Sequence, residues 1–266
     1  MTTSASPSTK STTRGIDEDY DSGSSVMTNK QISEALQGKG ISILAFDACL
    51  QGTIETLWSL KKRNVASYVI ASPDNIPGMG YDYQDLLTRF KNTSYTAEDF
   101  INSTIDAFQA EYASYAGGTL TPSLVAYNLA NLDLATLTSF YAWIYNDSLA
   151  SEKNNFESVL VDKYFNLSVY VDNVSGQPTE SSQTNGTDNL PLITWTHRNL
   201  YNYATYTDYP NKVTLQTMLD SVFVKGWKQF KTGSYKGLGI IGTWTLYIMQ
   251  NSGNTDLWYD IDSPGW

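Results

Sequence analysis

The chain has 266 residues, 41% of them hydrophobic, which is enough for one large domain or two small ones with a core. Its 17 Lys and Arg residues are outweighed by 27 Asp and Glu residues. The resulting charge of −10 argues against a nucleic-acid-binding surface, because that affinity comes largely from cations. With one Cys and one His, the chain can form neither an intrachain disulfide framework nor a Cys/His zinc cluster.

Residues 1–28 are polar and rich in Ser and Thr, so we expect a flexible tail or a processing loop. This segment contains no readable signal peptide, and no stretch of the chain is apolar for long enough to span a membrane. A composition rich in Tyr, Asn, Ser and Thr is common in exported bacterial proteins and predicts a secreted or cell-surface protein. No cofactor is expected. Calcium binding by the acids of this segment is an alternative, although a solvated acidic loop fits better because the ligand spacing is irregular. These acids are Asp17, Glu18, Asp19 and Asp21.

Residues 29–100 predict an α/β core. A continuous apolar run indicates a strand buried on both faces of a parallel sheet, and apolar residues at helical spacing indicate a helix. The predicted order is a helix at 29–38, a strand at 41–46, a helix at 50–63, a strand at 66–72 and a helix at 83–90. Strand, helix and strand form a βαβ unit with parallel strands.

Residues 101–172 predict a helical segment, residues 173–190 a linker loop and residues 191–266 a C-terminal α+β segment. The individual helices are predicted at 97–114, 123–150, 197–205 and 213–230, and one or two strands are predicted at 237–249.

Two polar segments follow the two predicted parallel strands. Cys49 comes just after the first strand, and Ser72 follows the second. Because carboxyl ends of parallel strands meet at one edge, where ligands gather in α/β sheets, we expect these residues to converge. A thiol near the start of the next helix is favoured as a thiolate. The alternative is that Cys49 is a small buried hydrophobe, as free Cys commonly is.

Several short sequence motifs around Cys49 occur in the order that is found in one protein family. The apolar strand runs into Asp47-Ala48-Cys49-Leu50, Glu55 follows on the next helix, then come the strand Tyr68–Ser72 and the loop Pro77–Tyr83. This pattern closely resembles the clostripain-like cysteine peptidases of the caspase–gingipain–legumain clan. The resemblance is specific over Ile43–Tyr83 and extends more weakly over most of residues 12–250.

The resemblance implies a caspase-like, mostly parallel sheet flanked by helices, and a peptidase that acts on peptide or protein substrates. Cys49 would be the nucleophile, and Asp47 would pair with a substrate Arg or Lys. Ser72 and Met79 would contribute to substrate binding. Met79 stands where members that prefer basic residues can carry a second acid, which makes a preference for Arg or Lys less firm. The resemblance implies no metal at the site.

The sequence departs from the family pattern in the residue that serves as the general base. The family's catalytic His precedes the Cys, whereas residues 1–48 contain no His. We therefore expect the first strands of the sheet, with the His, to lie in a missing N-terminal segment or chain. The sequence is then a processed Cys-bearing chain, a truncated fragment or a degenerate homologue. His197, the only histidine, is expected to have a structural or surface role.

Two further functions stay open. An inactive homologue would act as a peptide-binding surface protein, and the absent His favours it. The second alternative is a carbohydrate-binding surface protein, which the 19 Tyr and 7 Trp residues suggest, although most of them lie at the helical spacing typical of core residues. Glu55 is expected to anchor structure, and Gly78 and Gly80 to serve turn geometry.

Overall fold

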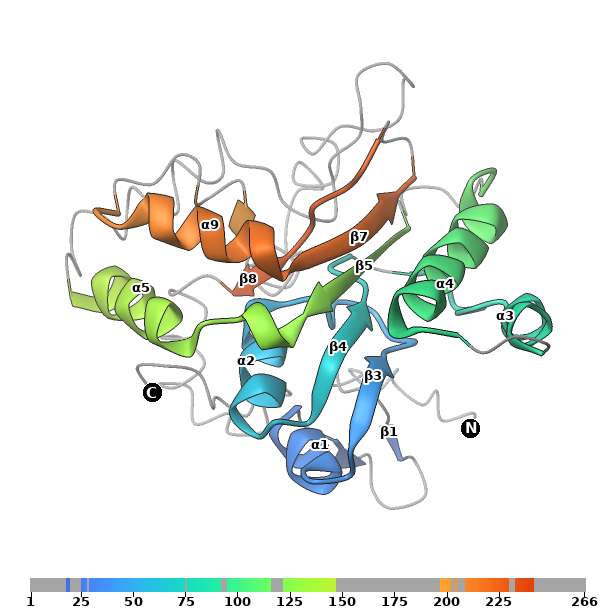
Figure 1. The fold of residues 1–266 in the computed structure, drawn as a ribbon, viewed down its shortest axis with the longest axis horizontal. Helices are drawn as coiled ribbons and strands as arrows, with labels where there is room; N and C mark the ends of the chain where they lie inside the picture. Colours follow the sequence, from blue (N-terminus) through green and yellow to red (C-terminus); the bar gives the residue numbers. More distant parts are fainter. Residues whose placement is uncertain are drawn as a thin grey trace, which may run out of the picture.

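The structure is a computed structural model (Figure 1), which describes part of the chain. The described residues are 18–19, 25–27, 29–74, 76–91, 95–115, 122–146, 197–201, 204, 209–229 and 233–241. The strands are β1 (Glu18–Asp19), β2 (Ser25–Val26), β3 (Ile41–Ala45), β4 (Ala66–Ala71), β5 (Ser123–Asn128), β6 (His197–Asn199), β7 (Phe223–Lys228) and β8 (Gly239–Ile241). The helices are α1 (Asn29–Leu36), α2 (Ile54–Lys62), α3 (Tyr83–Phe90), α4 (Ala97–Tyr112), the short η1 (Leu129–Asn131), α5 (Leu134–Asn146) and α9 (Lys212–Val222).

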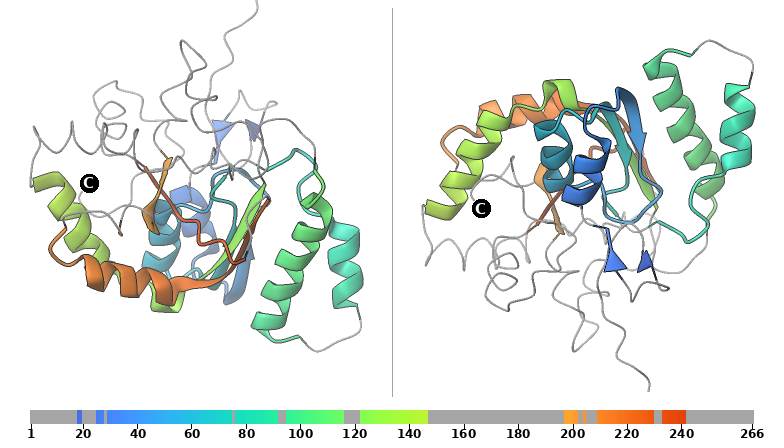
Figure 2. Two further views of the ribbon diagram at one scale, coloured as in Figure 1. Left: turned by 90° about the horizontal axis from the view of Figure 1, so that it is seen from above. Right: turned by 90° about the horizontal axis from the view of Figure 1, so that it is seen from below.

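A four-stranded sheet with the order β3-β4-β5-β7 forms the centre of the fold. β3 and β4 are parallel, and β5 is antiparallel to both of its neighbours, so β3, β4 and β7 run in the same direction. Figures 1 and 2 show α1, α2, α5 and α9 on one face of the sheet and α3 and α4 on the other. The predicted α/β class, with a sheet flanked by helices, is confirmed.

Alternate residues of the central strands enter two separate cores. On β5, Val125 and Tyr127 pack with α2, α5 and α9, whereas Leu124 and Ala126 pack with α4. All four are fully buried, as expected for a strand covered by helices on both faces. The edge strand β3 differs, because its apolar residues Ile41–Ala45 are only half-buried or exposed.

The predicted βαβ unit is confirmed, with the two strands paired in parallel register from Ile41 opposite Ala66. The helix between them starts later than predicted. α2 begins at Ile54, and Thr53 caps it by accepting a hydrogen bond from the Thr56 amide at 3.3 Å. Cys49 therefore lies in a turn that precedes the helix.

Three helix predictions were wrong in part. Residues 123–128 form β5, residues 223–228 form β7 and residues 197–199 form β6. β5 and β7 each adjoin a helix, so one largely apolar stretch contains both elements, whereas β6 has the polar sequence His-Arg-Asn and adjoins the helix that was predicted to include it. A fully buried strand carries apolar residues on both faces, and periodicity alone does not separate it from a buried helix.

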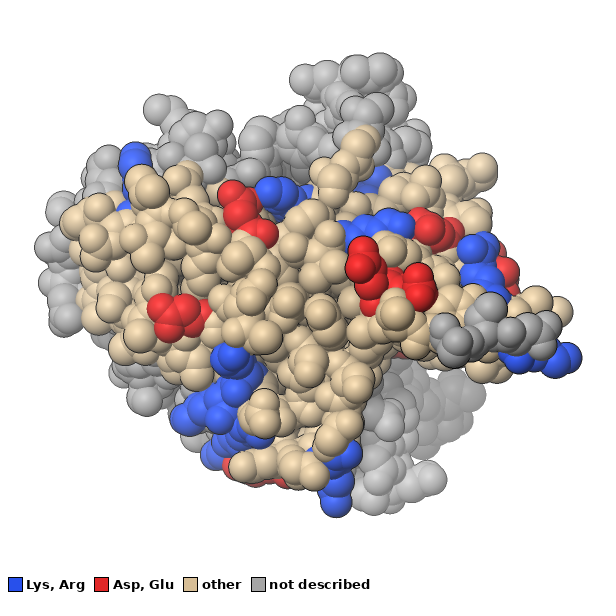
Figure 3. Space-filling model, viewed as in Figure 1, with Lys and Arg blue, Asp and Glu red and all other residues tan. Residues whose placement is uncertain are grey.

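Other predictions are confirmed or lie outside the described residues. α1, α3 and α4 lie where helices were predicted, and β8 lies within the late strand segment. The linker prediction at 173–190 lies outside the described residues, as does most of the N-terminal tail, in which β1 and β2 pair antiparallel. None of the described helices is both long and apolar enough to cross a membrane. Acidic and basic side chains are interspersed on the face drawn in Figure 3.

Candidate active site

The turn that carries Cys49 is tied to the segment after β4. The Leu50 amide donates to the Asp74 carbonyl at 3.0 Å, and the Gly52 amide donates to the Ser72 carbonyl at 2.8 Å. Leu50 has a φ of 60°, a left-handed conformation that few side chains adopt and that surrounding contacts must hold. The predicted convergence of the two strand ends is therefore present in the structure.

The thiol of Cys49 is half-buried and faces the backbone of Ile76. The Ile76 amide donates to Sγ at 3.4 Å, and Sγ lies 3.6 Å from the Ile76 carbonyl oxygen, to which a protonated thiol donates. The backbone of one residue, Ile76, can therefore serve both protonation states, because its carbonyl accepts from the thiol and its N–H stabilises a thiolate.

Asp47 lies on the same turn, and its carboxylate is exposed. Its Oδ2 accepts hydrogen bonds from the Tyr83 hydroxyl at 2.8 Å and from the Tyr81 amide at 3.3 Å. The carboxylate also lies against Gly80, where a Cβ atom would come within 2.2 Å of Oδ2. Gly80 has a φ of 66°, so both its conformation and this close approach require glycine.

Tyrosines of the neighbouring loop and helix hold this arrangement. The Tyr81 hydroxyl donates to the Phe46 carbonyl at 2.8 Å, and the Tyr112 hydroxyl donates to the Gly80 carbonyl at 2.5 Å. Burial, followed by the hydrogen bond to Asp47, raises the pKa of Tyr83 to about 12. Burial likewise raises the pKa of Tyr112 to about 12. Both hydroxyls are therefore protonated donors at neutral pH.

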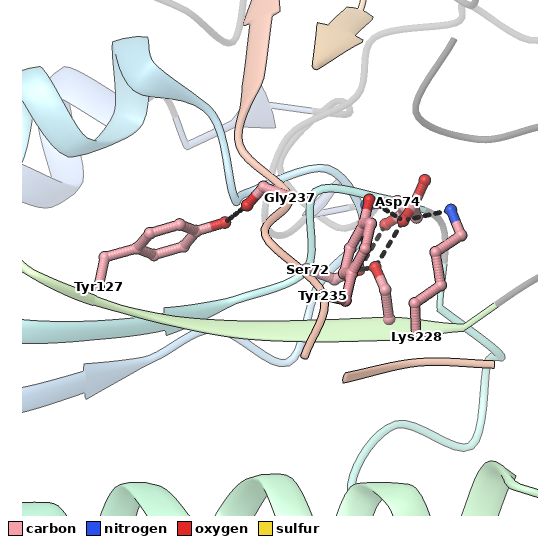
Figure 4. A network of polar contacts seen from close by, with 7 residues as sticks. Ser72, Asp74, Tyr127, Lys228, Tyr235 and Gly237 are labelled. Carbon is pink, nitrogen blue, oxygen red and sulfur yellow. Dashed lines mark hydrogen bonds and ion pairs between the residues drawn. The ribbon is translucent and has the colours of Figure 1, made fainter. Parts of the chain in front are cut away.

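A second acid, Asp74 (Figure 4), follows β4, is buried, and is joined to the Cys49 turn through the hydrogen bond of its carbonyl with the Leu50 amide. Its Oδ2 accepts from Ser123 Oγ at 2.5 Å, Lys228 Nζ at 2.9 Å and the Tyr235 hydroxyl at 3.3 Å. Burial raises the pKa of Asp74, and the charge of Lys228 is the largest effect that opposes it. The sequence did not indicate this network, because Lys228 fell within a predicted helix and a Lys is rarely fully buried.

The predicted site residues lie in different environments. Met79 is 67% exposed on the loop beside Asp47. Ser72 is fully buried, and its hydroxyl is used by the Asp74 backbone and Ser123, a position that argues against direct contact with substrate. His197 begins β6, and its side chain lies outside the described part of the structure.

The calcium hypothesis also falls outside what the structure describes, because Asp17 and Asp21 and the side chains of Glu18 and Asp19 are not described. Among the described residues, no three metal-ligating side chains gather at one place.

The fold thus places a half-buried thiol and an exposed carboxylate on one turn at the strand ends of an α/β sheet. Comparison with known sequences gives the class of protein. A sequence model of the clostripain family of C11 peptidases matches residues 3–262, and the chain therefore belongs to the clostripain family of cysteine proteases. No curated protein matches the chain.

Solved structures with this fold are also clostripain-family proteases. A clostripain of Bacteroides thetaiotaomicron ATCC 29148, in complex with the peptide inhibitor BTN-VLTK-AOMK, is 16% identical with a TM-score of 0.55 over 88% of this chain and 93% of that one. A cysteine protease of B. fragilis is 17% identical with a TM-score of 0.53, over 90% and 94% of the two chains. An inactive zymogen C11 protease of Parabacteroides distasonis is 16% identical with a TM-score of 0.57, over 86% of this chain and 61% of that one.

Proposed function

We propose that the protein is a clostripain-like cysteine endopeptidase that cuts peptide bonds after a basic residue, with Cys49 as the nucleophile. The observation that carries this proposal is the turn itself. It presents a half-buried thiol, in contact with the Ile76 peptide, and an exposed carboxylate, Asp47, two residues before it. A thiol beside a carboxylate suits attack on a carbonyl next to a cationic side chain.

In the proposed reaction, the Cys49 thiolate attacks the peptide carbonyl carbon. The C–N bond breaks, the amine leaves with a proton from a general acid, and a thioester remains on Sγ. Water then attacks the thioester, which releases the carboxylate product and restores the thiol. Asp47 pairs with the basic side chain and thereby places the scissile carbonyl at Sγ.

The free oxygen of Asp47 favours Lys over Arg. Oδ2 already accepts two hydrogen bonds, from Tyr83 and Tyr81, while Oδ1 accepts none from the described residues. Arg pairs best with both oxygens of a carboxylate, whereas the point charge of Lys needs only one. The inhibitor bound to the similar B. thetaiotaomicron clostripain contains the peptide VLTK, which ends in Lys.

The general acid and base belongs, in this proposal, to a His-bearing segment or chain outside the sequence. Residues 1–48 contain no His. Within the described sheet, β3 pairs only with β4, and its apolar residues are half-buried or exposed. A further strand paired with this edge would cover them and would end at the same rim as Cys49. We also propose export from a bacterial cell, in line with a similar C11 protease of B. thetaiotaomicron that is described as secreted.

Covalent labelling tests the proposal. A peptidyl acyloxymethyl ketone with a terminal Lys alkylates an active thiolate and releases its carboxylate. We expect intact mass to show one adduct on the protein expressed with its upstream segment, and none on the Cys49→Ala variant. The same peptide with Glu in place of Lys is the control for Asp47. Equal labelling by the Glu probe, or no labelling by either, contradicts the proposal.

A non-catalytic role is the second candidate, favoured by the single histidine of the sequence. An inactive homologue would bind peptide or carbohydrate at the surface without cleaving it. It is supported if the Lys peptide binds reversibly and no probe labels Cys49.

A further inference from the structure

The segment after β4 holds Cys49 at two points. The carbonyl of Asp74 accepts from the Leu50 amide, directly after Cys49, at 3.0 Å, and the amide of Ile76 contacts Sγ at 3.4 Å. Movement of this segment therefore moves both the backbone that carries the thiol and the N–H that faces it.

The side chain of Asp74 anchors the segment to the C-terminal half of the chain. Its three donors come from β5 (Ser123), from β7 (Lys228) and from the strand-like segment before β8 (Tyr235), as Figure 4 shows. That last segment is itself fixed, because the Tyr235 amide donates to the Gly226 carbonyl at 3.1 Å. Ser72 also holds the Asp74 backbone, since its hydroxyl donates to the Asp74 carbonyl at 2.9 Å and accepts from the Asp74 amide at 3.1 Å.

We propose that Asp74 is a positioning residue for Cys49, and that Ser123, Lys228 and Tyr235 set the reactivity of the thiol through it. None of the four is classed as a catalytic residue, since the hydrogen bonds of Sγ within the described part of the chain are to the backbone of Ile76. The catalytic consequence of this proposal rests on the proposed function, whereas its effect on thiol reactivity does not.

The energetics favour positioning over stability as the role of the network. Lys228 and Asp74 have exposed side-chain fractions of 0% and 2%, and an ion pair this deeply buried gains little over apolar residues of similar volume. Charge-assisted hydrogen bonds fix direction as well as distance, which apolar packing does not. Three such donors on one carboxylate oxygen therefore define where the Asp74 backbone lies, and with it the Ile76 amide.

A matched pair of serines tests the proposal. Ser123→Ala removes a buried hydroxyl that contacts Asp74, and Ser33→Ala removes a buried hydroxyl that contacts Ser59, between α1 and α2. Both serines are fully buried. Cys49 is the only cysteine in the chain, so the alkylation rate with iodoacetamide at neutral pH reports on this thiol alone. The unfolding free energy is measured for each variant in parallel.

We expect Ser123→Ala to slow alkylation of Cys49 about threefold and Asp74→Asn about tenfold, whereas Ser33→Ala leaves the rate unchanged at a similar loss of stability. Tyr235→Phe and Tyr201→Phe form a second pair, because the Tyr201 hydroxyl donates to the Leu219 carbonyl of α9 and not to Asp74, and only Tyr235→Phe is expected to slow the reaction. An equal effect of the two serine variants, or a faster reaction in Ser123→Ala, overturns the proposal, because Asp74 then only supports or shields the thiol.

Iodoacetamide needs no peptide recognition and no His, so these outcomes do not depend on whether the chain cleaves peptides. In the active protein, the same Ser123→Ala change is expected to lower kcat about threefold with KM unchanged. A change in KM alone would contradict the positioning role.

Discussion

Two aspartates on either side of Cys49 differ in almost every physical respect. Asp47 is exposed and accepts two hydrogen bonds on one oxygen. Asp74 is buried and accepts three on one oxygen, one of them from a fully buried Lys228. An exposed carboxylate with a free oxygen is available to a ligand, whereas a buried and paired one is committed to the fold. Under the two proposals above, the same type of side chain serves substrate recognition at Asp47 and placement of the Cys49 thiol at Asp74.

The largest expected effect comes from breaking the buried ion pair of Asp74, which leaves an unpaired charge in the core. Lys228→Met leaves Asp74 buried without its counter-charge, and we expect a loss of about 3–5 kcal/mol in the free energy of unfolding at pH 7. Lys225→Met, on the same strand, removes an exposed pair with Asp106 and should cost at most about 1 kcal/mol. Urea unfolding of the two variants measures the difference. Equal losses in the free energy of unfolding would mean that breaking the buried Lys228 pair costs no more than breaking a surface pair.

The pH dependence of that loss gives a further check. Burial raises the pKa of Asp74 above 3.8 in the folded protein, and loss of Lys228 removes the main opposing effect. In the pH range between 3.8 and the raised value, the folded state binds a proton that the unfolded state does not, so stability falls as pH rises. We therefore expect the destabilisation by Lys228→Met to grow as pH rises above 3.8 towards neutrality. If the destabilisation by Lys228→Met became smaller as the pH rose, ionisation of the buried Asp74 would not be its cause.

On the Asp47 side we expect the opposite result, a loss of recognition with little change in stability. Asp47→Asn should weaken binding of a Lys peptide to the Cys49→Ala protein by about a hundredfold, because a cation then loses its partner charge. Its unfolding free energy should change by no more than about 0.5 kcal/mol. Asp85→Asn, an exposed acid on α3 paired with Arg89, is the control for net charge. If both variants weaken binding equally, Asp47 is not a specific partner.

Gly80 links recognition to backbone geometry. Gly80→Ala places a Cβ within 2.2 Å of Asp47 Oδ2 at a φ of 66° and should cost about 1–2 kcal/mol while it displaces the carboxylate. Gly38→Ala has a similar φ of 72° and nothing within 4 Å, so it reproduces the strain without the contact. We expect only Gly80→Ala to weaken binding of the Lys peptide, measured by calorimetry, and the alkylation rate of Cys49 to stay unchanged in both.

Sequence reasoning found the Asp47 side and missed the Asp74 side for a physical reason. The strand ends and Cys49 could be placed from the sequence because the strand–turn–helix pattern around them is local, whereas the role of Asp47, two residues before Cys49, came from the resemblance to the clostripain-like family. The Asp74 network joins residues about 50 to 160 positions apart, and nothing local marks Ser123 or Lys228 as its members. Lys228 in particular looks like an exposed residue.

The same limit explains the strands that were predicted as helices. β5 is apolar at Leu124, Val125, Ala126 and Tyr127 because both of its faces are covered, and α5 follows after a few residues. The boundary has one local signal, Asp133, whose carboxylate accepts from the Ala135 and Thr136 amides at 3.1 Å and 3.2 Å. A polar residue able to cap a helix, in the middle of an apolar run, could have separated the two elements.

The smallest expected effect concerns how Asp47 distinguishes Lys from Arg. Tyr83→Phe removes the hydroxyl that donates to Asp47 Oδ2 at 2.8 Å and leaves the ring in place. Oδ2 then keeps only the hydrogen bond from the Tyr81 amide and can accept one N–H of an Arg fork while Oδ1 accepts the other, so the preference for Lys over Arg should fall about threefold. Tyr95→Phe removes a hydroxyl near the far end of α3, where it donates to the Arg89 carbonyl, and should leave the preference unchanged.

Binding of matched Lys and Arg peptides to the Cys49→Ala protein measures this ratio without cleavage. A lower ratio in Tyr83→Phe alone would mean that the protein tunes its exposed aspartate with a neighbouring hydroxyl, as it fixes its buried aspartate with Ser123. An unchanged ratio would mean that the Tyr83 hydroxyl moves aside when a cation arrives. The two aspartates would then differ further, because only the buried one would keep its hydrogen bonds when substrate binds.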